Sequence, residues 1–218
     1  MLSTDKLTEL PLFPLGTVLF PGGLLPLRIF EVRYLDMIKK CHASGLPFGV
    51  VSLTQGTEVR RPRPEAAGDG FAEETFHPVG TLAHITEFVV PQPGLILIRC
   101  TGMQRFEISR SEKLRHGLWM ADATLLLDDV AVPVPDDLQP AAAALKDLID
   151  KLRQQSVPDD KMPLLMPYQL SDCGWVANRW SELLPIPVAL KQQLMGLDNP
   201  LVRLELISDI LDRSGMSR

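Results

Sequence analysis

Ser3 and Lys6 stand three positions apart near the start of the chain, which is the spacing of a Ser-x-x-Lys pair. A serine whose proton is taken by a lysine can attack a carbonyl carbon and so perform acyl transfer. Such a pair works only when it is held rigidly, and the first residues of a chain usually fray. Because four-residue patterns also arise by chance, we predict no catalytic residue from it.

The histidines and cysteines have the chemistry of zinc ligands but not the spacing. Zinc needs three or four ligands that converge on one point. Cys41 and His42 are adjacent at the expected end of a helix, where neighbouring side chains point in different directions. We therefore predict no metal site and three reduced, mostly buried thiols. The residues considered are Cys41, Cys100, Cys173, His42, His77, His84 and His116.

Three pairs of adjacent carboxylates have the residue types of acid–base catalysis. They are Asp128-Asp129, Asp136-Asp137 and Asp159-Asp160, and because each flanks an expected turn or helix start, we interpret them as caps and solvated turns. The chain also has no phosphate-binding Gly-x-x-x-x-Gly-Lys loop, no Gly-x-Ser-x-Gly elbow and no His-Glu-x-x-His pair. The sequence therefore predicts a protein that is not an enzyme and uses no cofactor.

The composition is that of a globular chain with an acidic balance. Of the 218 residues 45% are apolar, and the formal net charge of −5 disfavours nucleic acid and anionic membranes as partners. Residues 10–27 carry no charge over the length of a membrane span, but they contain four prolines and three glycines, which lipid does not tolerate. Since no secretory signal precedes them, we expect a cytoplasmic protein built from short strands and turns.

One amphipathic helix is predicted in the first part of the chain. Phe30, Tyr34, Met37 and Ile38 recur at helical spacing, with charged residues between them. Gly45 is the expected end of this helix. Phe30 and Tyr34 lie one turn apart, so we expect both side chains to hold the helix against its neighbours.

The rest of the first 130 residues is predicted to be β-structure. Residues 54–77 lose all periodicity, and we interpret them as a loop whose basic cluster, Arg60 to Arg63, is solvated. Strands are predicted where β-branched, aromatic or alternating apolar residues gather. These segments are 10–13, 17–20, 24–29, 48–53, 79–90, 95–100, 104–108 and 118–127.

Residues 133–135 read Pro-Val-Pro and mark a boundary, after which the pattern becomes helical. Four short helices are predicted between residues 137 and 213, so we expect two domains, 1–132 and 133–218. In the last helix Leu204 belongs to the buried stripe and its neighbour Arg203 is expected in solvent. The expected helix caps are Asp136, Ser171 or Asp172, and Asn199.

Five stretches of the chain resemble the N-terminal domain of Lon proteases. They occur in the family's order and together extend over nearly the whole chain, so each strengthens the others. The opening stretch reads Pro-Leu-Phe-Pro-Leu, Val-Leu-Phe-Pro-Gly and Leu-Pro-Leu-Arg-Ile-Phe-Glu-Val-Arg-Tyr. The matching residues are 11–34, 79–85, 95–108, 183–187 and 198–206.

This resemblance implies an α+β protein: a PUA-like β pseudo-barrel with one amphipathic helix, followed by a C-terminal bundle of short helices. In full-length Lon proteases this region helps to engage substrate proteins and to assemble the enzyme. The ATPase and Ser-Lys peptidase domains that follow in Lon have no counterpart in these 218 residues. The chain therefore resembles a stand-alone substrate-binding domain, and no catalytic residue is carried over.

The resulting hypothesis is a non-enzymatic protein that binds polypeptides with exposed apolar segments, or a protein partner, and that is compatible with a weak homo-oligomer. Leu24 and Leu25 follow two glycines, and adjacent residues of a strand point to opposite faces. One leucine can then serve the core while the other contacts a peptide. The alternative is an RNA-binding PUA-like module using Arg60 to Arg63, against which the acidic net charge counts.

Overall fold

The computed structural model describes residues 5–59 and 73–215, which belong to two compact units, Met1–Leu127 and Asp128–Arg218. The basic cluster at residues 60–63 lies outside the described residues. The predicted α+β class is confirmed, because the first unit consists of strands with one α-helix and the second of helices. Within the described ranges, no helix combines the length and the apolar content needed to cross a membrane.

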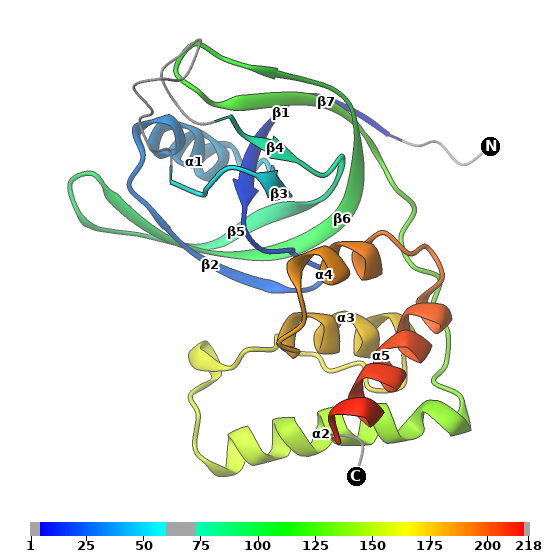
Figure 1. Ribbon diagram of the computed structural model, residues 1–218. Coiled ribbons are helices and arrows are strands. Elements are labelled where there is room, and N and C mark those ends of the chain that lie inside the picture. Colours follow the sequence, from blue (N-terminus) through cyan, green and yellow to red (C-terminus); the bar gives the residue numbers. More distant parts are fainter. Residues whose placement is uncertain (1–4, 60–72, 216–218) are drawn as a thin grey trace. The chain divides into compact units, whose positions relative to one another are not determined.

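The first unit is a closed ring of strands that curve around a common interior (Figure 1). Five strands pair in the order β1, β7, β6, β5, β3, and β3 then pairs back onto β1, with Leu12 opposite Gly49. This closing pair is parallel, whereas the other described pairings are antiparallel. The strands are β1 (Lys6–Leu15), β2 (Leu24–Ile29), β3 (Phe48–Gln55), β4 (Thr75–Phe76), β5 (Val79–Gln92), β6 (Leu95–Lys113) and β7 (Trp119–Leu125).

The apolar interior of the first unit follows from the two-residue period of its strands. Along β6 the buried residues Ile96, Ile98 and Cys100 alternate with half-buried ones, so that one face of the strand points inward. The helix α1 (Val32–Ser44) adds Tyr34 to the same cluster, where its ring stacks on Phe13 with centroids 4.0 Å apart. The one predicted amphipathic helix is therefore confirmed.

The prediction that Phe30 holds this helix in place is wrong. Phe30 is 54% exposed, because α1 begins only at Val32 and Phe30 precedes its first turn. Arg33, one of the charged residues between the apolar positions, is buried instead. Gly45 ends the helix as predicted, with a φ of 68° that favours glycine.

The predicted strand at residues 17–20 is also wrong, although its residues are largely buried. This segment runs as irregular chain whose carbonyls are satisfied from the side: Thr81 Oγ1 donates to the Leu19 carbonyl at 2.6 Å. Gly102 of β6 lies so close that a Cβ there would collide with the Phe20 carbonyl oxygen. The apolar run thus packs as a buried loop, which β-propensity alone does not distinguish from a strand.

Pairings between distant residues move other predicted boundaries. The loop predicted at 54–77 is shorter, because β3 continues to Gln55 and the two residues of β4 pair back onto it, with Leu53 opposite Phe76. The two strands predicted at 95–100 and 104–108 form the single long strand β6. Local sequence windows do not contain these partners, so they give shorter elements.

The second unit contains the four predicted α-helices within its described residues. Asp172 caps α3, accepting a hydrogen bond from the Trp175 amide at 2.7 Å, and Asn199 caps α5. Asp136 does not cap a helix: it starts a 3-10 turn, and α2 follows without a side-chain cap. The helices are α2 (Gln139–Gln154), α3 (Cys173–Leu183), α4 (Val188–Met195) and α5 (Pro200–Ser214).

Arg203 is not in solvent, as the sequence predicts, but 1% exposed. Its Nη1 donates to Asp129 Oδ2 at 2.6 Å and to Asn178 Oδ1 at 2.9 Å, and its Nε donates to the Leu194 carbonyl at 2.9 Å. One guanidinium thus joins α5, α3, the end of α4 and the segment before α2. The neighbouring Leu204 is fully buried, as predicted.

We predict that Arg203→Ala destabilises the protein by about 3–5 kcal/mol, because it leaves Asp129 without its cation. Leu204→Ala should cost about 2–5 kcal/mol through lost burial and the cavity that remains. The exposed neighbour Glu205 provides the control, and Glu205→Ala should change stability by less than about 0.5 kcal/mol. Urea unfolding compares the three variants, and an Arg203→Ala midpoint equal to that of Glu205→Ala would contradict the structural role of Arg203.

Candidate functional site

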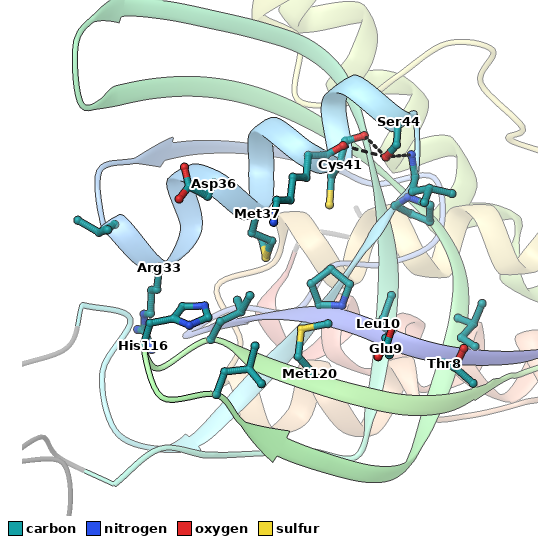
Figure 2. A pocket seen from close by; sticks show the side chains of 18 residues that line it. Thr8, Glu9, Leu10, Arg33, Asp36, Met37, Cys41, Ser44, His116 and Met120 are labelled. Atoms are coloured by element: carbon teal, nitrogen blue, oxygen red, sulfur yellow. Dashed lines mark hydrogen bonds between the residues drawn. The ribbon is translucent and has the colours of Figure 1, made fainter.

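A pocket of about 640 Å³ opens in the first unit between α1 and the strands β1 and β7 (Figure 2). We call it the α1 pocket. Its volume lies within the range of sites that hold small ligands or side chains of a partner. The lining comes from β1 (residues 7–11), from α1 and from Leu46 and Pro47 beyond its end, and from the β6–β7 turn and β7.

The wall formed by α1 is one face of the helix. Arg33, Met37, Cys41 and Ser44 line the pocket, and they recur every three or four residues. Ser44 Oγ donates to the Lys40 carbonyl at 2.8 Å and accepts from the amide of Leu46 at 3.4 Å (Figure 2). This contact turns the chain after α1 so that the exposed Leu46 lies at the pocket.

The wall formed by β1 is the edge of a strand and not one of its faces. Residues 7–11 are consecutive and all line the pocket, although alternate side chains of a strand point to opposite faces. The register explains this: β7 pairs with one edge of β1 from Lys6 to Leu12, whereas β3 pairs with the other edge only from Leu12 onward. Over residues 6–11 no described strand covers that second edge.

A β-bulge distorts this wall. The register between β1 and β7 shifts between Leu7 and Leu10, and Glu9 inside the shift has a φ of 54°, the left-handed region that non-glycine residues seldom adopt. The Glu9 amide is satisfied by Asp122 Oδ1 at 3.3 Å. Thr8 and Glu9, the two residues inside the register shift, both line the pocket.

A buried ion pair holds α1 at one end of the pocket. Arg33 Nη1 donates to both carboxylate oxygens of Glu74, at 2.9 and 3.1 Å, and to the Gly117 carbonyl at 3.2 Å. Arg33 Nε also donates to Glu31, while Glu74 accepts from Trp119 Nε1 at 3.1 Å. Because Gly117 and Trp119 flank Leu118, which lines the opposite wall, this network ties α1 to the segment that forms that wall.

The cysteine that lines the pocket is not an activated thiol. Burial raises the pKa of the Cys41 thiol, so that this lining residue is a neutral thiol near pH 7 and a poor nucleophile. Cys100 lies in the core and does not line the pocket. Burial, and to a smaller extent the charge of Cys41, raises the pKa of the Cys100 thiol to about 12. Within the described residues no three His, Cys, Asp or Glu side chains gather as metal ligands would.

Leu24 and Leu25, the residues predicted to contact a peptide, lie in β2 opposite Thr101 and Cys100 of β6. Both are half-buried, and Leu25 packs against the larger core cluster of the first unit. Neither residue lines the α1 pocket. Their role in binding stays a prediction.

Sequence reasoning missed the α1 pocket because its walls are distant in sequence. Residues 7–11, 32–47 and 114–120 meet only when the ring closes. The helical wall gave a partial indication, since Arg33, Met37 and Cys41 recur every four residues on the buried side of α1 and also line the pocket. Nothing local indicates that the edge of β1 is left open there.

Comparisons with known proteins agree on one family. The family model described as the ATP-dependent protease La (LON) substrate-binding domain matches residues 9–213. A Lon protease from Flavobacterium johnsoniae is 26% identical over 195 residues, covering 87% of this chain and 22% of that protein. A Lon protease from Anaeromyxobacter dehalogenans is 24% identical over 211 residues, covering 94% of this chain and 23% of that protein. The chain thus spans less than a quarter of the length of these curated relatives.

Solved structures give the same result. The Lon N-terminal domain protein from Xanthomonas campestris is 28% identical, with a TM-score of 0.71 over 93% of this chain and 98% of that one. The N-terminal domain of the Mycobacterium avium complex Lon protease shares the fold at 15% identity, with a TM-score of 0.59 over 94% of this chain and 97% of that one. The predicted resemblance to Lon N-terminal domains is therefore confirmed.

We predict that alkylation of the native protein with iodoacetamide reaches Cys41 before Cys100. Cys41 lines a pocket, whereas Cys100 is fully buried and its pKa is about 12. Because only the thiolate reacts and the pKa of Cys41 is raised, its rate should still be rising at pH about 9, where an ordinary thiol approaches its plateau. Mass spectrometry of peptides measures both rates. Urea-unfolded protein is the control, and there the two cysteines should react alike.

Proposed function

Since this chain belongs to the family of substrate-binding domains of ATP-dependent protease La (Lon), we propose that it binds polypeptides through apolar side chains that they expose. The observation that carries the proposal is the α1 pocket. Leu10, Leu118 and Met120 contribute apolar surface to it, and Leu46 stands exposed at its side. An apolar side chain that leaves water for such a hollow gains free energy in proportion to the area it buries.

The α1 pocket is the favoured site because its shape can enclose a side chain on several sides. The surface around Leu24 and Leu25 is a second candidate, supported by the alternation that leaves only Leu25 packed against the core cluster. Its two leucines are half-buried already, so they have less apolar area to offer a partner. RNA binding gains no support, since the matching relatives are Lon proteases and their names refer to no nucleic acid.

We predict that an uncharged fluorescein-labelled peptide, Gly-Ser-Leu-Phe-Val-Gln-Gln-Ser, binds the protein with micromolar or weaker affinity. Combined Leu46→Ser and Leu114→Ser should weaken binding about tenfold, because both side chains line the α1 pocket. Fluorescence anisotropy gives the dissociation constants, and circular dichroism confirms that each variant is folded. Binding should change little with salt, since charge does not drive it.

Two further variants serve as controls for this measurement. Val130→Ser removes an exposed apolar residue that does not line the pocket, so it should leave the affinity unchanged. Leu24→Ser with Leu25→Ser tests the second surface. Full affinity in the Leu46/Leu114 variant, with a loss in the Leu24/Leu25 variant, would move the site to β2. No binding by the wild-type protein would refute the proposed function.

We also propose that the chain is not an enzyme by itself. The match is to the substrate-binding part of Lon, and the chain carries no phosphate-binding loop. The purified protein should release no phosphate from ATP and cleave no casein, measured by phosphate release and by gel electrophoresis over several hours. Turnover that co-elutes with the protein through two different chromatography steps would contradict this expectation.

A further inference from the structure

The open edge of β1 is a feature of the backbone and is separate from the apolar side chains that line the α1 pocket. Over residues 6–11 one edge of the strand pairs with β7, and no described strand pairs with the other, which faces the α1 pocket. Apart from Pro11, which has no N–H, and Glu9, whose amide is bonded to Asp122, such an edge carries peptide N–H and C=O groups that an extended partner can pair with as an added strand. A partner seated in the pocket would therefore lie beside backbone groups suited to an extended chain.

A second, smaller hollow of about 210 Å³ adjoins the α1 pocket, and its charged residues determine whether a cation or an anion of a partner is favoured there. The two share Glu9 and Met120 in their linings. The second hollow adds Glu112 and Asp122, and its one cation, Arg110, already lies 3.5 Å from Glu112. We call it the acidic hollow.

The charged residues around the α1 pocket itself do not offset the negative charge of the acidic hollow. Arg33 is neutralised by Glu31 and Glu74, both within 3.1 Å. Asp36 and Lys40 on α1 offset one another, which leaves Glu9 as the excess charge where the two hollows meet. Both Glu9 and Glu112 are exposed, so they can receive a cation without the cost of burying a charge.

We propose that the polypeptide bound by this chain is an extended segment that adds to the open edge of β1, places an apolar side chain in the α1 pocket and places a lysine or arginine of the same segment in the acidic hollow. This inference rests on the proposed function and defines its substrate class. The shared residues Glu9 and Met120 put the two subsites side by side. In an added strand, residues two positions apart point to the same side and rise about 6–7 Å, so a single short segment can reach both.

The test compares four labelled peptides of one length. The first is Gly-Ser-Leu-Phe-Val-Gln-Gln-Ser; the second and third replace both glutamines by lysine or by glutamate. The fourth is the lysine peptide with N-methyl groups on alternate residues of its apolar part. The lysine peptide should bind about fivefold tighter than the neutral one and the glutamate peptide more weakly, and this order should fade between about 0.05 and 0.5 M salt. N-methylation, which removes strand-pairing donors, should weaken binding at least about tenfold.

Protein variants assign the preference to the acidic hollow. Combined Glu9→Gln and Glu112→Gln should bring the lysine and neutral peptides to equal affinity. Glu205→Gln with Asp209→Asn removes the same charge from exposed positions of α5 and should leave the preference intact.

Each outcome tests a different part of the proposal: the charge selectivity, the strand addition or the underlying function. Equal binding of the lysine and glutamate peptides would overturn the charge selectivity, and full binding of the N-methylated peptide would overturn strand addition. In both cases binding of the neutral peptide would leave the proposed function standing. Failure of the neutral and the lysine peptides to bind the wild-type protein would refute the proposed function itself.

Discussion

The position of β1 is the constraint on which the first unit depends. This strand pairs antiparallel with β7 on one edge and parallel with β3 on the other, and only that parallel pair closes the ring. The two pairings overlap at Leu12 alone, so each edge of the strand is covered over only part of its length: β7 pairs before Leu12 and β3 after it. Closure of the sheet and an open edge near the start of β1 are thus two results of one register.

The helix α1 turns that open edge into a pocket. It packs Tyr34 and Met37 into the core of the ring, and a flanking stripe then faces β1 across the gap. The Arg33–Glu74 pair ties the start of the helix to Gly117 and Trp119, which flank Leu118 of the other wall. Removing one member of such a buried pair is expensive, whereas the intact pair contributes little net stability. Its contribution here is positional: it joins the helix to the segment that forms the other wall.

Sequence patterns predict this fold well where local chemistry decides it. Four features could be predicted because each follows from neighbours within a turn or two. They are the helix end at Gly45, the caps at Asp172 and Asn199, and the burial of Leu204. Arg203 and Phe30 were placed wrongly for different reasons. An arginine is expected in solvent by residue type, but Arg203 is buried against Asp129, a carboxylate from a distant segment. Phe30 shares the apolar spacing of α1 but precedes its first turn, because the helix begins only at Val32. The candidate site shares the limit met at Arg203, since its three walls come from separate parts of the chain.

The bulge at Glu9 bears directly on the proposed binding of a polypeptide, because Glu9 lines both hollows. A regular strand turns neighbouring side chains such as Thr8 and Glu9 to opposite faces. With Glu9 in the left-handed region, its amide is satisfied by Asp122, and the residue lines both the α1 pocket and the acidic hollow. A non-glycine residue in this conformation costs free energy that the surrounding structure must offset. Here the offset comes from the pairings on either side of the bulge, Leu7 with Ala123 and Leu10 with Ala121, which hold the strand in place while the bulge brings the charged and the apolar subsites together.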